Sequence, residues 1–454
     1  MAEWFNNLHP VLQALIRSLT FVGPMLVMVA LVIWFERRLL GWFQDRQGPN
    51  RVGTITLRHR DKWVPPFLKG KKISLQGLIQ PFADITKLVV KEEIQPSAAD
   101  LVIYVIGPGL ALFPSIVLGA TIPWGPYKPL TPVADVNIGV LWILAIASLG
   151  VYGVVLSGYA SNNKYSLLGG LRSSAQLISY ELGMGISLAC IVLATGSLKP
   201  TDMVTAQQEA LWGFVTPLAN WFILTPHGFI AAIVFFICMV AETNRAPFDL
   251  PEAENELVAG YHTEYSSAKF ASYFMGEYAA MIVYGGIFTT VFLGGYHLAP
   301  IRFEYLAQQG GAVSTLAAGL HWADFWLAPL WFLGKVFLII FVYIWLRATL
   351  PRMRYDQLMS LGWRTLLPVA TVNLIVVAMW LLLQRLLNPA LAFGIAVATF
   401  GLLYWLLNAV LGTVRGSSEL AGEPLESRSV RLVSVKANVP VPEVAEAATE
   451  GGAA

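Results

Sequence analysis

The stretch that decides the fold is an apolar run followed at once by acids: WFILTPHGFIAAIVFFICMVA (Trp221–Ala241), then ETNRAPFDLPEAENELVAGYHTE (Glu242–Glu264). A second apolar run, Phe270–Leu293, follows. The acidic stretch holds six of the 28 acids in the 454-residue chain. Carboxylates at a membrane boundary are costly unless they are hydrated, paired or protonated. We therefore expect this segment to be a working part of a membrane protein.

The composition supports that class, since 56% of residues are hydrophobic, 13% are charged and the mean hydropathy is +0.61. In soluble proteins about a quarter of residues are charged, so a soluble multidomain core is the weaker alternative. The sequence predicts an all-α polytopic membrane protein with about nine transmembrane helices, an interfacial amphipathic helix and structured cytoplasmic loops. The expected spans are Ser18–Phe35, Leu101–Ile122, Ile138–Tyr159, Ala175–Thr195, Trp221–Ala241, Phe270–Leu293, Phe325–Leu346, Leu366–Leu387 and Ala390–Val414.

The placement of lysine and arginine predicts the orientation. With the N-terminus outside, the inward loops and the tail hold 24 of the 30 basic residues and the outward side holds five. The N-terminus lacks a basic region of the signal-peptide kind, so the first run is expected to be a retained span. We expect a multi-pass protein of the bacterial plasma membrane with a cytoplasmic C-terminus, the mitochondrial inner membrane being the alternative. Residues 1–414 are expected to form one transmembrane domain, with an acidic loop at 242–269, and residues 415–454 a flexible C-terminal tail.

An amphipathic helix is predicted at about residues 75–92. Its apolar residues recur at helical spacing, and the length is too short and too polar to cross a bilayer, so it should lie along the interface. Gln80, Asp84, Lys87 and Lys91 share the opposite face. A plain surface anchor explains the apolar face, but explains Asp84 only by its i,i+3 pairing with Lys87.

Three ionisable residues are expected deep within spans: Glu181, about nine residues into its helix, Glu277, and the single deep cation Lys335. Such residues face the interior of a helix bundle and mark ion or proton paths. The alternative is a structural Glu–Lys pair or a protonated, hydrogen-bonded carboxyl group.

Within the acidic stretch, Pro251 can begin a short helix in which Glu252 and Glu256 lie on one face and Glu254 points away. A purely solvated acidic loop is the alternative. It is disfavoured by interleaved apolar residues, such as Phe248, that are typical of a segment packed against protein.

Several chemistries are excluded by the sequence. It contains no Walker loop, no dinucleotide-binding glycine motif and no nucleophile elbow. Its two cysteines, Cys190 and Cys238, lie in apolar runs and cannot hold an iron–sulfur cluster or a structural zinc alone. The chain is therefore expected to bind no metal or redox centre by itself, and to handle protons, bind a substrate, or both.

Five blocks of sequence resemble the H-subunit family of proton-pumping NADH-quinone oxidoreductase, respiratory complex I, in the order of that family. The resemblance covers about Phe35 to Leu387. The blocks are FERRLLGWFQDRQGPNRVG (35–53), QPFADITKLVVKE (80–92), LRSSAQLISYELGMG (171–185), AETNRAPFDLPEAENELVAGYHTEYSSAKF (241–270) and RATLPRMRYDQLM (347–359).

The resemblance implies a protein at the junction of the membrane and peripheral arms that helps to form a chamber for a lipid quinone. It implies a chain of acids from that chamber to the proton-translocating subunits. The implied proton-path residues are Glu181, Glu242, Asp249, Glu252, Glu254, Glu256, Glu264 and Glu277. The residues implied at the chamber and its charged lining are Glu36, Arg37, Asp84, Lys87, Arg347, Arg352 and Arg354.

The same resemblance implies that quinone is the substrate, and that NADH, FMN and iron–sulfur clusters belong to partner subunits. Expected partners are the peripheral-arm subunits of the iron–sulfur and quinone site, small membrane-arm subunits and membrane lipids, with no nucleic acid. The chain departs from the family pattern in about 20 residues at 54–73 and in its long tail.

Three rival functions are compatible with parts of the sequence. The first is the homologous membrane subunit of an energy-converting hydrogenase or of another quinone- or phenazine-reducing complex, disfavoured by the unbroken QGPNRVG and ETNRAPFDLPE blocks. The second is a secondary transporter, which predicts an internal repeat that is not evident. The third is an inert scaffold, disfavoured by Glu181 and Glu277 within spans.

Overall fold

The computed structural model describes residues 9–56, 72–127, 130–211, 215–250, 258–308 and 312–387, together with scattered positions between 391 and 405. The chain divides into two units, residues 1–405 and 406–454, and the second lies outside the described residues. The expected tail and most of the ninth span therefore remain predictions.

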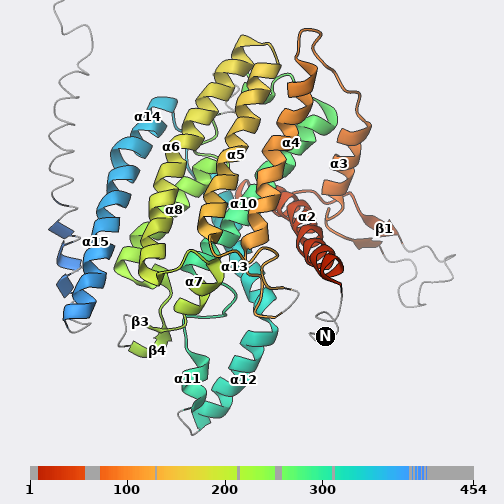
Figure 1. The fold of residues 1–454 in the computed structure, drawn as a ribbon. Helices are drawn as coiled ribbons and strands as arrows, with labels where there is room; N and C mark the ends of the chain where they lie inside the picture. The colour runs from red at the N-terminus through yellow and green to blue at the C-terminus, as the bar shows by residue number, and fades with distance from the viewer. Residues whose placement is uncertain are drawn as a thin grey trace, which may run out of the picture. The chain divides into compact units, whose positions relative to one another are not determined.

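Helices dominate the first unit (Figure 1). The elements are α2 (Pro10–Phe43), β1 (Thr54–Thr56), β2 (Lys72–Ser74), α3 (Gln80–Val90), α4 (Leu101–Leu118), η2 (Gly119–Thr121), α5 (Gly139–Ala160), α6 (Lys164–Thr195), α7 (Pro200–Ala206), β3 (Ala210–Leu211), β4 (Val215–Ala219), η3 (Phe222–Leu224), α8 (Pro226–Glu242), η4 (Gly260–His262), α10 (Ser267–Phe292), α11 (Phe303–Gln308), α12 (Ala312–Trp326), α13 (Ala328–Thr349), α14 (Tyr355–Ser360), η5 (Leu361–Leu366) and α15 (Leu367–Leu386). Two antiparallel ribbons, β1–β2 and β3–β4, are the sheets of the described part.

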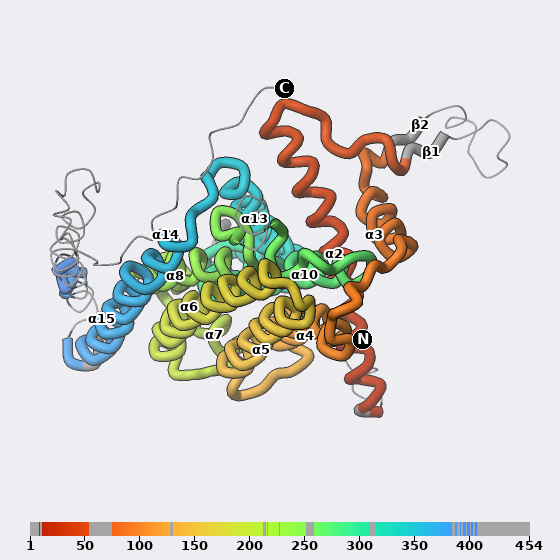
Figure 2. Tube along the Cα trace, turned by 90° about the horizontal axis from the view of Figure 1, so that it is seen from above, coloured from red at the N-terminus to blue at the C-terminus, as the bar shows by residue number. Residues whose placement is uncertain are grey.

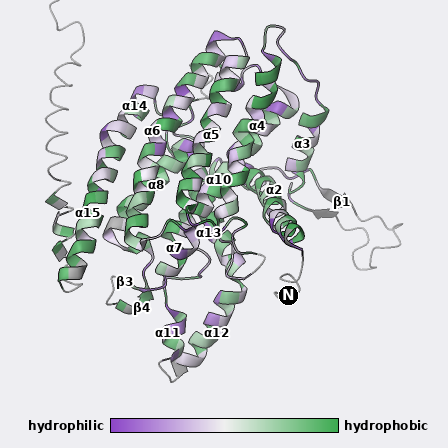
Figure 3. Cartoon of the chain, viewed as in Figure 1, coloured by the Kyte–Doolittle hydropathy of each residue, from purple (hydrophilic) through white to green (hydrophobic). Residues whose placement is uncertain are grey.

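The all-α polytopic class is confirmed. Seven helices of the described part are long and apolar enough to cross a membrane, and they correspond to seven of the expected spans. Figure 3 shows hydrophobic residues along these helices. The expected span Trp221–Ala241 is shorter than predicted, because Phe222–Leu224 forms a separate 3₁₀ turn and α8 has 17 residues.

Helix α10 is the centre of the bundle. It packs against α2, α4, α8 and α13, while α4, α5, α6 and α15 follow one another alongside (Figure 2). Among the seven candidate spans, α10 has the lowest mean hydropathy, 1.2, and the largest buried share, 78%. A helix surrounded by protein rather than lipid can carry polar side chains when neighbouring helices pair them.

Helix α6 begins earlier than expected, at Lys164 rather than near Ala175. Asn163 caps it by accepting a hydrogen bond from the backbone amide of Tyr165 at 3.0 Å. Glu181 is therefore the eighteenth residue of a 32-residue helix, not the ninth, and lies roughly 25 Å along its axis at 1.5 Å per residue. The prediction therefore placed Glu181 too near the start of its helix.

Helix α3 is also shorter than the predicted 75–92. Gln76 and Gly77 have φ angles of 51° and 78°, which a right-handed helix cannot contain, so the helix begins at Gln80 with Pro81 in its first turn. It ends at Val90, because Lys91 is extended. The apolar side chains of Phe82 and Val89 are exposed, at 55% and 62%, as an interfacial helix requires.

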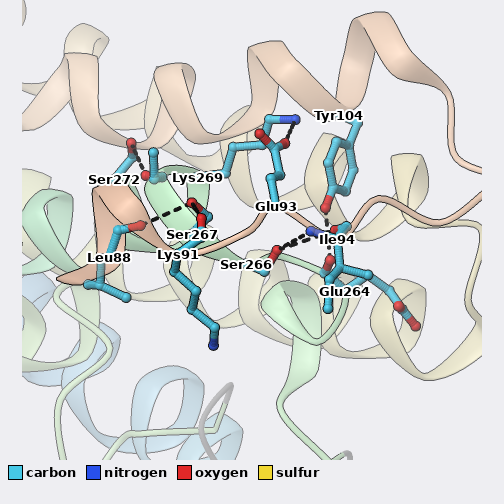
Figure 4. A network of polar contacts seen from close by, with 11 residues as sticks. Leu88, Lys91, Glu93, Ile94, Tyr104, Glu264, Ser266, Ser267, Lys269 and Ser272 are labelled. Carbon is cyan, nitrogen blue, oxygen red and sulfur yellow. Dashed lines mark hydrogen bonds and ion pairs between the residues drawn. The ribbon is translucent and has the colours of Figure 1, made fainter.

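The start of α10 holds the chain that leaves α3 (Figure 4). The Ser267 hydroxyl donates hydrogen bonds to the carbonyl oxygens of Leu88 and Lys91, at 3.0 and 2.8 Å. The Ser266 hydroxyl accepts one from the amide of Ile94, at 2.9 Å. Lys269 pairs with Glu93 in the same network. These contacts fix α3 against the central helix.

Lys335 contacts backbone carbonyl groups and an aromatic ring. Its ammonium group donates hydrogen bonds to the carbonyl oxygens of Leu293, Gly295 (3.0 Å) and His297, and lies 4.0 Å from the ring centre of Trp221. The final carbonyl groups of a helix have no partner within the helix and attract a cation. Lys335 therefore holds Leu293, the C-cap residue of α10, and the turn that follows it, and its hydrogen bonds run to backbone rather than to a glutamate.

Replacing Lys335 with Met is expected to lower the Tm of the detergent-solubilised protein, because the end of α10 loses charged hydrogen bonds contributing on the order of 2 kcal/mol. Lys199→Met is the control, since Lys199 forms an exposed ion pair with Asp135 at 2.9 Å and such pairs contribute little. Equal Tm values for the two variants would contradict this role of Lys335.

Candidate functional site

The acidic stretch begins where α8 ends. Thr243 caps the helix and Asn244 adopts a φ of 49°, so the chain turns sharply after Glu242. The turn carries Arg245 into the bundle, where 5% of its surface is exposed. The expected helix from Pro251, with Glu252, Glu254 and Glu256, lies outside the described residues.

Arg245 joins two buried carboxylates. Its guanidinium lies 3.6 Å from Glu36 of α2 and 3.8 Å from Glu277 of α10. The same group lies 4.3 Å from the ring centre of Tyr278. A buried charge is tolerated when it is paired with opposite charges and polar groups. Arg245 therefore ties α2 and α10 to the segment that follows α8.

Glu36 has a second cation. Arg347, near the C-terminal end of α13, also pairs with it, although 311 positions separate the two in sequence. Glu36 is 4% exposed, so its charge is shared between two arginines rather than with water. Two residues expected at the charged lining are thus brought together.

A cavity of about 80 Å³ lies beyond Glu277. Its walls include Glu242, Asn244, Glu277 and Tyr284. Tyr284 lies close enough to Glu242 to interact with it electrostatically. Oε2 of Glu242 and Oδ1 of Asn244 are buried and accept no hydrogen bond within the described part. At roughly 10–15 Å³ for each water, a cavity of this size and polarity has room for several.

Glu181 completes the line of acids. It lies on α6, close enough to Glu242 and Tyr284 to interact with them electrostatically. The structure therefore brings Glu36, Glu277, Glu242 and Glu181 into one succession, linked by Arg245 and by the cavity. This succession joins α2, α10, α8 and α6.

Asp249 belongs to a separate ion pair. Its carboxylate lies 3.0 Å from Arg352, and the backbone amide of Met353 donates to the carbonyl of Pro247 at 3.0 Å. Arg354 follows at the start of α14, where its amide is bonded to Gln357. These contacts hold the acidic segment against the chain between α13 and α14.

Asp84 pairs with Arg37 of α2 and accepts a hydrogen bond from Gln80 at 3.1 Å. The surface-anchor alternative explained Asp84 only by a pairing with Lys87. In the structure, the ion pair of Asp84 is formed with Arg37, which lies on the neighbouring helix α2. Arg37, Asp84 and Lys87 lie at a groove of about 240 Å³ between α2, α3 and α10, otherwise lined mainly by apolar side chains. Tyr278 lines this groove and also contacts Arg245.

Glu264 lies apart from Arg245, within the turn before α10. Its carboxylate accepts a hydrogen bond from Asn163 at 2.7 Å, and its carbonyl oxygen accepts one from Tyr104 at 2.8 Å. The next residue, Tyr265, is 5% exposed, and burial raises the pKa of its hydroxyl. Glu264 thus belongs to a second polar region, formed with Asn163 and Tyr104.

Arg245, Tyr278 and Tyr284 were not predicted as site residues. Arg245 had one available signal, since it is the only lysine or arginine in a stretch with six acids. The tyrosines had none, because a tyrosine within an apolar helix looks like a packing residue. In the described part of the chain no group of three or more His, Cys, Asp or Glu is arranged to hold a metal ion.

The fold and this site define a polytopic membrane protein with a succession of acids inside its helix bundle. A family model described as NADH dehydrogenase matches residues 16–378, and the chain belongs to that family. The match covers every described residue of the site.

Curated relatives are similar over most of their length. The NADH-quinone oxidoreductase H subunit 1 of Geobacter metallireducens is 44% identical over 369 residues, 79% of this chain and 93% of that protein. The H subunit of Rickettsia felis is 41% identical over 377 residues, 83% of this chain and 95% of that protein. The H subunit of Ralstonia nicotianae is 40% identical over 384 residues, with 84% and 95% covered. The resemblance seen in the five sequence blocks is confirmed.

Replacing Arg245 with Met is expected to destabilise the protein strongly, because Glu277 and Glu36 would lose a cation that they share inside the bundle. Breaking one buried ion pair costs on the order of 3 kcal/mol. Melting of the detergent-solubilised protein measures the loss, and Arg46→Met, on an exposed loop, is the control. A Tm equal to that of the control would show that Arg245 does not hold these elements together.

Proposed function

We propose that this chain is the membrane subunit of an NADH-quinone oxidoreductase that helps to form the quinone-binding chamber and couples quinone reduction to proton translocation. One observation carries the proposal. The groove at Arg37 and Asp84 is linked through Tyr278 and Arg245 to Glu277, and from there across the cavity to Glu242 and Glu181. A ligand in the groove and a proton on Glu181 are thereby parts of one electrostatic system.

The groove suits a lipid with a polar headgroup. Its walls are largely apolar, with Ile33, Phe270 and Phe274 among them, while three charged side chains lie at one side. Ligand pockets of this kind bury an apolar body and orient it by a few polar groups. The exposed apolar face of α3 would place the groove beside lipid, from which a quinone enters.

Charge balance at Arg245 supplies the coupling. A negatively charged quinone species near Tyr278 would compete with Glu277 for the guanidinium of Arg245. A buried carboxylate that loses its cation is stabilised by taking up a proton. Water in the cavity can then pass that proton to Glu242 and Glu181, whose like charges make them titrate as a coupled set.

The remaining parts of this function involve other subunits and the membrane. We propose that NADH, FMN and iron–sulfur clusters are held by partner subunits, and that the acidic segment 251–257 and the arginines Arg347, Arg352 and Arg354 face the peripheral arm. Small membrane-arm subunits would receive the protons from Glu181. The protein would lie in a bacterial plasma membrane, N-terminus outside and C-terminus in the cytoplasm.

Replacing Glu277 or Glu242 with Gln in the assembled complex is expected to reduce NADH-driven proton pumping and NADH-quinone turnover by at least fivefold. Each change removes a proton site while keeping the shape of the side chain. Inverted membrane vesicles allow both rates to be measured. Electron transfer from NADH to ferricyanide serves as the control for intact partner subunits, and unchanged pumping in both variants would refute the proposal.

Replacing Ala271 with Trp is expected to raise the KM for a long-tailed quinone at least threefold, because Ala271 lines the groove between α2, α3 and α10. The KM for a short-tailed quinone should change less. Ala268→Trp makes the same change at an exposed position of α10 and is the matched control. An equal KM in the two variants would place the quinone elsewhere.

A further inference from the structure

Three hydroxyl groups converge on Gly107 of α4. A Cβ atom at Gly107 would overlap the Ser157 hydroxyl of α5 and would lie 3.4 Å from the hydroxyls of Tyr265 and Tyr273. Glycine is thus the residue that leaves room for them. We call Ser157, Tyr265 and Tyr273 the hydroxyl triad.

The triad is buried and incompletely bonded. The hydroxyls of Ser157 and Tyr273 are hydrogen-bonded to each other, and Ser157 also donates to the carbonyl of Gly153. The Tyr265 hydroxyl lies beside both but makes no well-aligned hydrogen bond within the described part. Ser157, Tyr265 and Tyr273 are 0%, 5% and 3% exposed, respectively.

Packing alone does not explain these hydroxyls. Phenylalanine would fill the same positions with the same ring stacking and would bury no polar atom. The rings already form a tight cluster, with Tyr265 stacked on Tyr104 at 4.3 Å and set edge-on to Tyr273 at 5.1 Å. The hydroxyl groups of Tyr265 and Tyr273 therefore need an explanation other than ring packing.

The triad has a polar group at each end. On one side, Tyr104 stacks on Tyr265. The Tyr104 hydroxyl donates a hydrogen bond to the carbonyl of Glu264, as Figure 4 shows. The Glu264 carboxylate is oriented by Asn163. On the other side, Tyr273 lines the cavity that contains Glu242 and Glu277. The triad therefore borders the cavity through Tyr273 and reaches the backbone of Glu264 through the stacked ring of Tyr104.

We propose that the hydroxyl triad is a second proton entry to this cavity, running from the region of Glu264 and separate from the path through Arg245. A hydroxyl group both donates and accepts a hydrogen bond, so it can take a proton on one side and release its own on the other. For each proton accepted at Tyr265, one leaves Tyr273 into the cavity and each hydroxyl keeps one proton. No oxidant or reductant is consumed.

This inference rests on the proposed role of the cavity in proton movement and extends it to three further residues. The route would let the cavity refill with a proton while Arg245 is occupied by a bound quinone species. Glu277 and Glu242 would then receive protons from a side that the quinone does not block.

Tyr273→Phe in the assembled complex tests the proposal, since it removes one hydroxyl and keeps the ring. We expect NADH-driven pumping and NADH-quinone turnover to fall at least twofold, and the solvent isotope effect on turnover in D₂O to rise. Tyr159→Phe is the control, because Tyr159 is 61% exposed on α5 and lies outside the triad. Wild-type rates and an unchanged isotope effect in Tyr273→Phe would overturn the proposal.

Ser157→Ala provides a second variant, and by itself it should lower pumping and turnover and raise the isotope effect. Wild-type behaviour of Ser157→Ala would overturn the proposal where Tyr273→Phe does not assemble. Where both variants assemble, the two changes can be combined. The double variant should be no slower than the slower single variant, because both changes interrupt one route. If the rate losses of the two single variants add up in the double variant, the triad is not a single route and the proposal is overturned. If Glu277→Gln abolishes pumping while the triad variants pump normally, the coupling function stands and the second entry falls.

Discussion

The rest of the structure depends on how one guanidinium is neutralised inside the helix bundle. Arg245 can be buried only because Glu36 and Glu277 approach it from different helices, with the ring of Tyr278 beside it. A charge removed from water is tolerated when ion pairing and polar contacts replace its hydration. The positions of α2 and α10 relative to the turn after α8 are therefore set by charge as much as by packing.

The same constraint acts on further charged residues of the bundle. Glu36 also pairs with Arg347, and Asp249 with Arg352, so the end of α13 and the chain after it are held by carboxylates of distant segments. A change in the charge of one partner acts strongly on the others, because charges inside a protein are screened less than charges in water. Long-range coupling in such a bundle requires no large movement.

Much of the fold and part of the site could be predicted from the sequence. Apolar runs located seven spans, and Glu181 and Glu277 lie within two of them. The start of α6 was missed because polar residues near Lys164 resemble a loop, although Asn163 is a good helix cap. The start of α3 was missed because backbone angles at Gln76 and Gly77, not hydropathy, determine it. Partners such as Arg245 for Glu277, or backbone carbonyls for Lys335, depend on tertiary contacts that periodicity does not encode.

The β1–β2 ribbon has a consequence for how this family changes its length. Thr54 pairs with Ser74, Ile55 with Ile73 and Thr56 with Lys72, and the amide of Leu75 donates to the carbonyl of Gly53 at 3.4 Å. The chain thus leaves the ribbon after Thr56 and returns to it at Lys72, which is the pairing partner of Thr56. Residues added beyond such a paired base leave the ends of α2 and α3 where they were. Evolution can lengthen or remove this hairpin without moving the groove, which makes it a natural place for lineage-specific additions and for a grafted tag.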